Sequence, residues 1–258
     1  MNGSPDRHSP GTDGPNADRT TDRVTIESVR ATHNEVRSTR AILWDNDGVL
    51  VDTEKVFFEA NRRQLAVLGV DASWTDFERI NLRGGVSLLS LSGLDGDELR
   101  ALYARRDALY GELLRTEEFA IAGMSELVQR LSPRFQMGIV TSSHRDHFEI
   151  IHARSELLPH FDFQVVREDY ARAKPHPDSY LVGIARTGVP RERCLAVEDS
   201  PRGVAAARAA GLEVVLFAPG GVAREPEDGG WLARAESVTG LEEAIDRWAN
   251  GLHFRYPA

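Results

Sequence analysis

Two aspartates two residues apart, Asp45 and Asp47, follow the apolar run 41–44 in the segment AILWDNDGVLVD. The run predicts a short buried strand, and Gly48 marks the turn after it. In an open parallel sheet the carboxyl ends of the strands face a ligand crevice. There Asp45 could attack a phosphoryl group as a nucleophile while Asp47 donates and accepts protons. The segment alone also fits an ordinary polar turn. A calcium loop fits it less well, because residues 49–51 are apolar where that loop needs oxygen ligands.

A second apolar run, residues 137–140, leads into Thr141, Ser142 and Ser143. Hydroxyls and backbone N–H groups in this position can bind a phosphate, and Thr141 is the residue that we expect on the phosphoryl oxygens. The same residues can instead cap the helix that follows them, so this segment alone leaves both roles open.

Two later segments add charges of both signs. Lys174 precedes Pro175 in AKPHPDSY, and a lysine on such a fixed loop can direct a point charge at a phosphate, although most lysines are solvated surface residues. Glu198 and Asp199 end the apolar run 195–197, just before a helix of small residues. Their carboxylate oxygens suit Mg²⁺, and they equally suit the positive end of a helix dipole.

Taken together, the four segments resemble the four motifs of the haloacid dehalogenase superfamily of phosphotransferases, in the same order along the chain. The matching residues are DNDGVLVD, the threonine of TSS, the lysine of KPHPD and the acidic pair of EDS. The resemblance covers about residue 40 to the C-terminus and is strongest to the phosphoglycolate phosphatase and β-phosphoglucomutase subgroup. It implies an α/β fold, a doubly wound parallel sheet of Rossmann-like form, with a small all-helical cap inserted between the first and second motifs.

The resemblance also implies a mechanism. Asp45 would attack phosphorus in line and form an aspartyl phosphate, while Asp47 protonates the leaving alcohol. Asp47 would then activate the water that hydrolyses this intermediate. The cofactor would be Mg²⁺, held by Asp45, the backbone carbonyl of Asp47 and Asp199, with Glu198 binding either directly or through water. The residues expected to contact the phosphoryl group are Thr141, Ser142 and Lys174.

Residues 54–121 carry a helical pattern with no convincing strand, because leucines and phenylalanines recur there at helical spacing. We assign these residues to the inserted cap, where substrate choice is expected. In the loop INLRGGVS, Arg83 is the predicted charged substrate contact, and Gly84 beside it leaves room for the backbone. Arg83 fits equally well as a solvated cation at a helix end.

The residues at two cap positions favour hydrolysis over phosphate transfer within a sugar. The mutases of the subgroup carry a histidine in the first helix after the first motif and an arginine shortly after a cap glycine, where this chain has Phe57 and Ser87. We therefore expect a phosphatase acting on a small phosphorylated metabolite, such as a sugar phosphate or a phosphoglycolate-like acid. The alternatives are a β-phosphoglucomutase-like mutase and a non-catalytic relative that binds a phosphate or a partner. Dehalogenation and phosphonate cleavage are disfavoured because those relatives lack an equivalent of Asp47.

Composition agrees with a small-molecule enzyme. The 258 residues are 41% hydrophobic, and the net charge of -9 argues against partners such as nucleic acid or an anionic membrane. The single cysteine, Cys194, excludes an intramolecular disulfide and is expected to pack in a strand. No apolar run is long enough for a transmembrane helix and the N-terminus lacks a signal-peptide pattern, so we expect a cytoplasmic protein. The oligomeric state stays open, with a monomer favoured.

The sequence predicts three parts. Residues 1–37 are rich in glycine, proline and small polar residues and are expected to form a disordered tail. Residues 38–53 and 122–258 would form the phosphatase core, and residues 54–121 the cap. After the first strand, core strands are expected near residues 136–140, 161–166, 194–197 and 213–217, with a last packing helix over residues 240–248. The resemblance implies that the first strand is central, between the strands of the second and fourth motifs.

Overall fold

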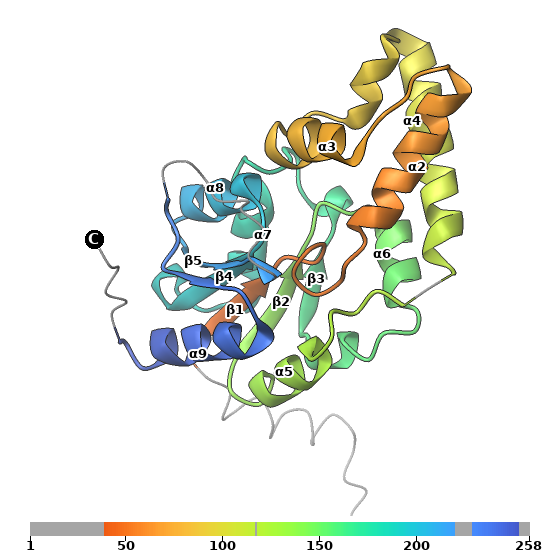
Figure 1. Cartoon of the computed structure of the whole chain (residues 1–258). Coiled ribbons are helices and arrows are strands. Elements are labelled where there is room, and N and C mark those ends of the chain that lie inside the picture. The colour runs from red at the N-terminus through yellow and green to blue at the C-terminus, as the bar shows by residue number, and fades with distance from the viewer. Residues whose placement is uncertain (1–38, 117, 220–228, 253–258) are drawn as a thin grey trace, which may run out of the picture. The chain divides into compact units, whose positions relative to one another are not determined.

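The computed structural model describes residues 39–116, 118–219 and 229–252 (Figure 1). The tail expected over residues 1–37 lies outside the described residues, so its disorder stays a prediction. In the described part the strands form one sheet, and helices connect most consecutive strands along the chain.

The six strands of this sheet are all parallel and follow the order β3-β2-β1-β4-β5-β6. The strands are β1 (Ala41–Trp44), β2 (Gln136–Val140), β3 (Phe163–Val165), β4 (Cys194–Glu198), β5 (Glu213–Phe217) and β6 (Ala233–Ala235). Because a parallel sheet is covered on both faces, its strands appear in the sequence as continuous apolar runs, and every residue of β1 is fully buried. The predicted central position of β1, between β2 and β4, is confirmed.

Side chains of β1 alternate between two hydrophobic cores, one on each face of the sheet. Ile42 and Trp44 belong to the core that α5, α6 and α9 cover, whereas Leu43 belongs to the core under α7 and α8. Figure 1 shows α5 and α9 on one side of the strands and α7 and α8 on the other. These helices are α5 (Met124–Leu131), α6 (Arg145–His152), α7 (Asp178–Thr187), α8 (Pro201–Ala209) and α9 (Val238–Ala249). The prediction of a doubly wound α/β fold is confirmed.

A group of helices is inserted between β1 and β2, as predicted for the cap. Its elements are α2 (Glu54–Val67), α3 (Trp74–Phe77), the π-helix η1 (Glu78–Arg83), the 3₁₀ helix η2 (Leu88–Ser92) and α4 (Gly96–Leu114). The insert has its own small core, in which the rings of Phe58 and Phe77 lie 5.5 Å apart. It therefore has the packing of a small separate unit.

The two connections between this insert and the sheet lie side by side. Asp52 donates its backbone N–H to Phe119 at 2.8 Å, and Ile121 donates to Leu50 at 3.0 Å. These bonds form a short antiparallel bridge between Val51 and Ala120. The paired connections fix where the insert begins and ends relative to Asp45 and Asp47.

Register along the sheet brings the predicted motifs to one edge. Trp44, the last residue of β1, is aligned with Ile139 of β2 and Val197 of β4. The residues that follow each of these positions must therefore meet at the carboxyl end of the sheet, which is where ligands bind in such folds.

The strand predictions differ from the structure in two places. The strand expected over residues 161–166 is confined to β3, because the 3₁₀ helix η3 (Leu158–His160) ends directly before Phe161. The edge strand β6 was not predicted, because its sequence Ala-Arg-Ala has no β-branched or aromatic residue. The last helix, α9, begins two residues earlier and ends one residue later than expected. Among the described helices, none is both long and apolar enough to cross a membrane.

We expect Gly138→Ala to destabilise the protein by about 1–3 kcal/mol, the usual cost of overpacking a core. Gly138 of β2 pairs with Phe163 of β3, and a Cβ at this glycine would overlap the Phe163 ring. Chemical denaturation should show the loss. In a Phe163→Ala background the same substitution should cost far less. Gly111→Ala, where a Cβ would meet only ordinary contacts of 3.6 Å or more, is the control. Equal costs in both backgrounds would contradict this packing argument.

Candidate active site

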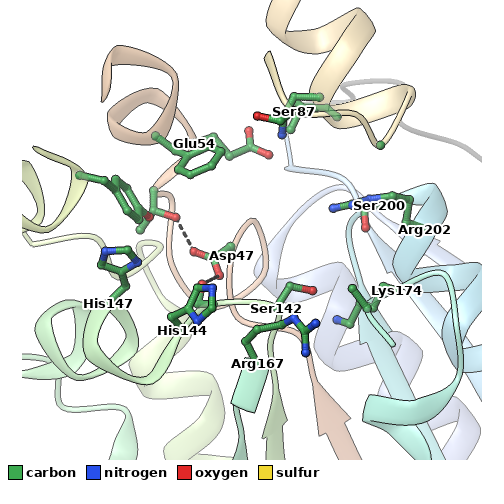
Figure 2. A pocket seen from close by; sticks show the side chains of 18 of the residues that line it. Asp47, Glu54, Ser87, Ser142, His144, His147, Arg167, Lys174, Ser200 and Arg202 are labelled. Carbon is green, nitrogen blue, oxygen red and sulfur yellow. Dashed lines mark hydrogen bonds between the residues drawn. The ribbon is translucent and has the colours of Figure 1, made fainter. Parts of the chain in front are cut away.

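A cavity of about 770 Å³ opens at the carboxyl end of the sheet, within the size range of small-molecule sites. The core contributes Asp45, Asp47 and Lys174 to its wall, and the insert contributes residues of α2, the η1–η2 loop and α4. Figure 2 shows Lys174 and Ser200 on one side of the cavity and Asp47 and His147 on the other. The side chains that could do chemistry therefore line one cavity.

Lys174 is held by three acceptors from three different strand ends. Its Nζ lies 2.8 Å from Asp45 Oδ1, 2.6 Å from Glu198 Oε1 and 3.1 Å from the carbonyl oxygen of Val140. These are the three hydrogen bonds that an ammonium group can donate. Burial alone would lower the pKa of Lys174, but the charges of Asp45 and Glu198 outweigh it and raise the pKa above its ordinary value. Lys174 is therefore a fixed positive charge.

Three buried carboxylates lie together beside this lysine. Asp45, Glu198 and Asp199 each offer an oxygen, and these oxygens lie within 4.8 Å of one another. Burial, with Glu198 adding to it, raises the pKa of Asp45 to about 7, even though Lys174 opposes the shift. A cluster with more buried negative charge than one lysine can balance suits a further cation. The donors are all hard oxygens, which fits Mg²⁺.

Glycines make room for these carboxylates. A Cβ on Gly48, which has a φ of 85°, would overlap the Asp199 carboxylate, and one on Gly203 would overlap that of Glu198. Because only glycine lacks a Cβ, the turn after β1 and the first turn of α8 can both approach the acids closely.

Asp47 is surrounded by hydroxyl donors. Its Oδ1 accepts from Thr53 Oγ1 at 2.5 Å, and its Oδ2 accepts from Ser143 Oγ at 2.7 Å and from Thr141 Oγ1 at 3.2 Å. Asn46 Nδ2 also donates to Oδ2, at 3.3 Å. Thr53 comes from the junction with the insert and the other hydroxyls from the loop after β2, so Asp47 lies where these parts meet.

Asn46 is oriented from behind by a buried histidine. His152 Nε2 lies 2.8 Å from Asn46 Oδ1, and its Nδ1 lies 2.8 Å from Ser155 Oγ. An amide oxygen can only accept, so Nε2 carries the proton and Nδ1 accepts from Ser155. Burial lowers the pKa of His152 to about 4. The neutral ring thus fixes the amide with its NH₂ group toward Asp47.

The structure brings most of the predicted site residues together. Asp45, Asp47, Ser142, Lys174 and Asp199 line the cavity. Thr141 and Glu198 are fully buried behind that wall. The Thr141 hydroxyl donates to Asp47 and accepts from the backbone N–H of Ser143, so it does not face the cavity as expected of a phosphate contact.

Arg83 and Gly84, the predicted substrate contacts of the cap, are not brought to the site. Both are exposed and neither lines the cavity, whose wall is formed instead by Gly85, Val86 and Ser87. The physical reason is the π-helix η1, which ends at Arg83. Its wider turn bonds Gly84 N–H to the carbonyl of Arg79, five residues back, and thereby changes the direction in which Arg83 leaves the helix.

Sequence reasoning missed the arginines that do line the cavity. Arg106 of α4 is only 8% exposed, and its guanidinium lies over the Phe57 ring at 4.6 Å and donates to Asn61 at 3.2 Å. Arg106 falls between Leu102 and Leu109 on the apolar stripe of that helix. A charge inside a helical apolar stripe was the signal that could have found it. Arg167 and Arg202 of the core also line the wall.

The fold and the site together define an α/β enzyme with a buried lysine–carboxylate centre beneath a helical insert. Residues 39–211 match the model of the haloacid dehalogenase-like hydrolases, and the chain belongs to that family.

Curated relatives and a solved structure agree with this assignment. Protein CbbY of Rhodobacter capsulatus is 32% identical over 69% of this chain and 84% of its own length. The phosphorylated carbohydrates phosphatase of Thermotoga maritima is 31% identical over 77% of this chain and 92% of its own. The structure of CbbY from Rhodobacter sphaeroides with phosphate shares the fold, with a TM-score of 0.66 and 24% identity over 80% of this chain and 99% of that one. The predictions of the superfamily and of a phosphoric monoester hydrolase are confirmed.

Protonation of His152 should make the protein less stable in acid. Its pKa is about 4 in the folded state against an ordinary 6.5, so below pH 6.5 the unfolded chain binds the proton more readily. This contribution to stability is fully present above pH 6.5 and is lost as the pH falls toward 4, by roughly 2–3 kcal/mol. Chemical denaturation of wild type and His152→Gln across pH 4–7 measures this contribution. The free energy of unfolding of the variant should depend less steeply on pH than that of the wild type. Parallel curves would contradict the prediction.

Proposed function

We propose that this enzyme is a Mg²⁺-dependent phosphatase that hydrolyses a small phosphorylated metabolite through an aspartyl phosphate on Asp45. The observation that carries the proposal is the buried pairing of Lys174 with Asp45 at the end of β1, beside Asp199 and open to the cavity. The names of relatives such as the phosphorylated carbohydrates phosphatase support a sugar phosphate or a similarly small phosphorylated acid as substrate.

Asp45 is the proposed nucleophile. A carboxylate oxygen of Asp45 bonds to phosphorus as the bond between phosphorus and the leaving oxygen breaks, and Asp47 donates its proton to that oxygen. The free alcohol departs. Asp47, now a carboxylate, takes a proton from water, which attacks the phosphorus of the aspartyl phosphate. The bond between phosphorus and the Asp45 oxygen breaks, inorganic phosphate leaves, and Asp45 is again a carboxylate and Asp47 again protonated.

The hydroxyl donors around Asp47 support its role in proton transfer. Thr53, Ser143 and Thr141 fix the carboxylate next to the space where the leaving oxygen must lie. A fixed donor contributes to catalysis because the proton donor and its acceptor are already held in the geometry of the transfer. Ser142, which is exposed and lines the cavity, remains the proposed phosphate contact of that loop, together with Lys174.

Asp45, Asp199 and the backbone carbonyl of Asp47 are the proposed Mg²⁺ ligands. When bound, the ion supplies positive charge that lets an anionic nucleophile approach an anionic phosphate. Glu198 is proposed to act through Lys174 and through water rather than as a direct ligand. Its Oε1 already accepts from Lys174 and from Tyr180, and its Oε2 accepts from Asp199 N–H.

Water is the proposed acceptor rather than a sugar. Phe57 and Ser87, which stand where mutases of the subgroup carry histidine and arginine, both line the cavity. The Phe57 ring lies against Arg106 and offers no proton-transfer group. We propose residues 54–121 as the cap and residues 38–53 and 122–258 as the phosphatase core.

Asp45→Asn should abolish phosphate release from p-nitrophenyl phosphate and from a panel of phosphorylated metabolites. The expected loss in kcat is about a thousandfold or more, because the amide cannot form the covalent intermediate. Asp52→Asn is the matched control, since Asp52 is exposed and lies in the same segment. Retained activity in Asp45→Asn would overturn the assignment of the nucleophile. Isomerisation of a hexose 1-phosphate faster than its hydrolysis would overturn the choice of water as acceptor.

Mg²⁺ should raise the melting temperature of the wild-type protein, and Asp199→Asn should remove most of this effect. At ten times its Kd the ion should stabilise the fold by about 1.4 kcal/mol, which corresponds to roughly 2–4 °C for a chain of this size. Thermal melts with and without Mg²⁺, repeated in Asp52→Asn as control, measure it independently of turnover. Equal stabilisation of wild type and Asp199→Asn would exclude Asp199 as a ligand.

A further inference from the structure

Arg202 lies in the first turn of α8, three residues after Asp199, and lines the cavity. In Figure 2 it is on the same side of the cavity as Lys174 and opposite Asp47. The proposed mechanism does not use Arg202, because Lys174 and the carboxylate cluster with its proposed Mg²⁺ act on the transferred phosphoryl group.

Other positive charges on the cavity wall have partners within the protein. Lys174 is paired with Asp45 and Glu198, and Arg106 donates to Asn61 and to Asp107. Arg167 donates to two backbone carbonyls. In the part of the chain that the structure describes, Arg202 is the cavity-lining arginine with neither a hydrogen bond nor an ion pair, and its Nε is buried without a partner.

Two energetic costs accompany this placement. A buried donor without an acceptor loses its hydration and gains nothing in return. A cation in the first turn of a helix also faces the positive end of the helix dipole, where anions are favoured. An unpaired buried donor and a cation at a helix N-terminus, with no interaction inside the protein to offset them, are typical of functional positions.

The insert approaches Arg202 closely enough to fix its stem. A Cβ on Gly85 would lie 2.8 Å from Arg202 Cδ, and Gly85 has a φ of 65°, which favours glycine. The loop of the insert therefore passes over the aliphatic part of the side chain. This contact limits where the guanidinium can go and leaves it beside the cavity.

We propose that Arg202 is a specificity-determining residue that binds a second anionic group of the substrate, a carboxylate or a phosphate, while the first phosphate lies at Asp45. The inference rests on the proposed function and narrows its substrate class to phosphate monoesters with a second negative charge at the far end of a small carbon skeleton. A guanidinium suits either group, because its paired N–H donors match two oxygens of a carboxylate or phosphate. A neutral sugar phosphate would leave the buried Nε of Arg202 without a partner.

Two pairs of substrates that differ mainly in the second charge test this proposal. One pair is 2-phosphoglycolate and 2-hydroxyethyl phosphate, and the longer pair is fructose 1,6-bisphosphate and fructose 1-phosphate. In at least one pair the wild-type enzyme should prefer the charged member by about tenfold or more in kcat/KM. Arg202→Gln should lower kcat/KM for that member by roughly 10- to 100-fold, mainly through KM, and change the neutral member less than about threefold. The pair that responds distinguishes a carboxylate from a phosphate as the second group.

Controls separate recognition from folding. Arg202→Lys keeps the charge and should retain part of the preference, and Arg105→Gln, an exposed arginine away from the cavity, should leave every rate unchanged. An equal loss for both members of each pair in Arg202→Gln, or no wild-type preference in either pair, would overturn the proposal.

A binding measurement distinguishes failure of this proposal from failure of the proposed function. In the Asp45→Asn background, calorimetry with 2-phosphoglycolate and fructose 1,6-bisphosphate should show Kd rising about tenfold or more for one of them when Arg202→Gln is added. Binding that depends on Arg202, together with a wild-type protein that shows no phosphatase activity, would support the anion subsite and refute the proposed reaction. Binding that is indifferent to Arg202 in an active phosphatase would refute the subsite alone.

Discussion

The buried ammonium of Lys174 is the interaction on which the fold and the site both depend. Its acceptors are Asp45 after β1, the carbonyl of Val140 in β2 and Glu198 in β4. A buried charge is tolerated only when it is paired and hydrogen-bonded, so the ends of these three strands must stay together once Lys174 is buried. Removing one partner of a buried ion pair typically costs about 3–5 kcal/mol, because the other charge is left uncompensated. The sheet order β2-β1-β4 and the position of Asp45, the proposed nucleophile, are thus maintained by the same contacts.

Dense negative charge around this lysine explains several features of the neighbouring backbone. Asp45, Glu198 and Asp199 can share so small a space only because Gly48 and Gly203 have no Cβ. Fully buried Glu198 is also supported by the hydroxyl of Tyr180. Once its oxygens are occupied in this way, Glu198 serves to hold Lys174, and Asp45 and Asp199 are left to face the cavity. The proposed division between supporting and reacting carboxylates is therefore consistent with their hydrogen-bond capacity.

The sequence predicts the core of the fold and the centre of the site because both are encoded locally. Buried parallel strands are continuous apolar runs. Asp45 and Asp199 directly follow strands, and Lys174 lies in the short proline-containing loop before α7. The cavity wall above them is encoded differently. Arg202 and Gly85 are more than a hundred residues apart and meet only when the insert packs against α8. The π-helix that ends at Arg83 changes side-chain direction by inserting an extra residue in one turn, which helical periodicity cannot reveal.

Two parts of the cavity, one around Asp45 and one around Arg202, differ in whether their charged side chains have partners within the protein. Around Asp45 the Lys174 ammonium and its carboxylate partners are hydrogen-bonded to one another, so that part is preorganised for the phosphate that we propose to bind there. At Arg202 the buried Nε has no partner among the described residues, and the proposed subsite supplies one from an anionic group of the substrate. In the proposed mechanism the preorganised part around Asp45 contributes to the rate of phosphoryl transfer, because its charged and polar groups are already in place for the transition state. The proposed subsite at Arg202 contributes to selectivity, because a ligand without the complementary negative charge leaves the Arg202 Nε unpaired. Under the two proposals, chemistry and substrate choice therefore depend on different residues of one cavity, Asp45 with Lys174 for the first and Arg202 for the second.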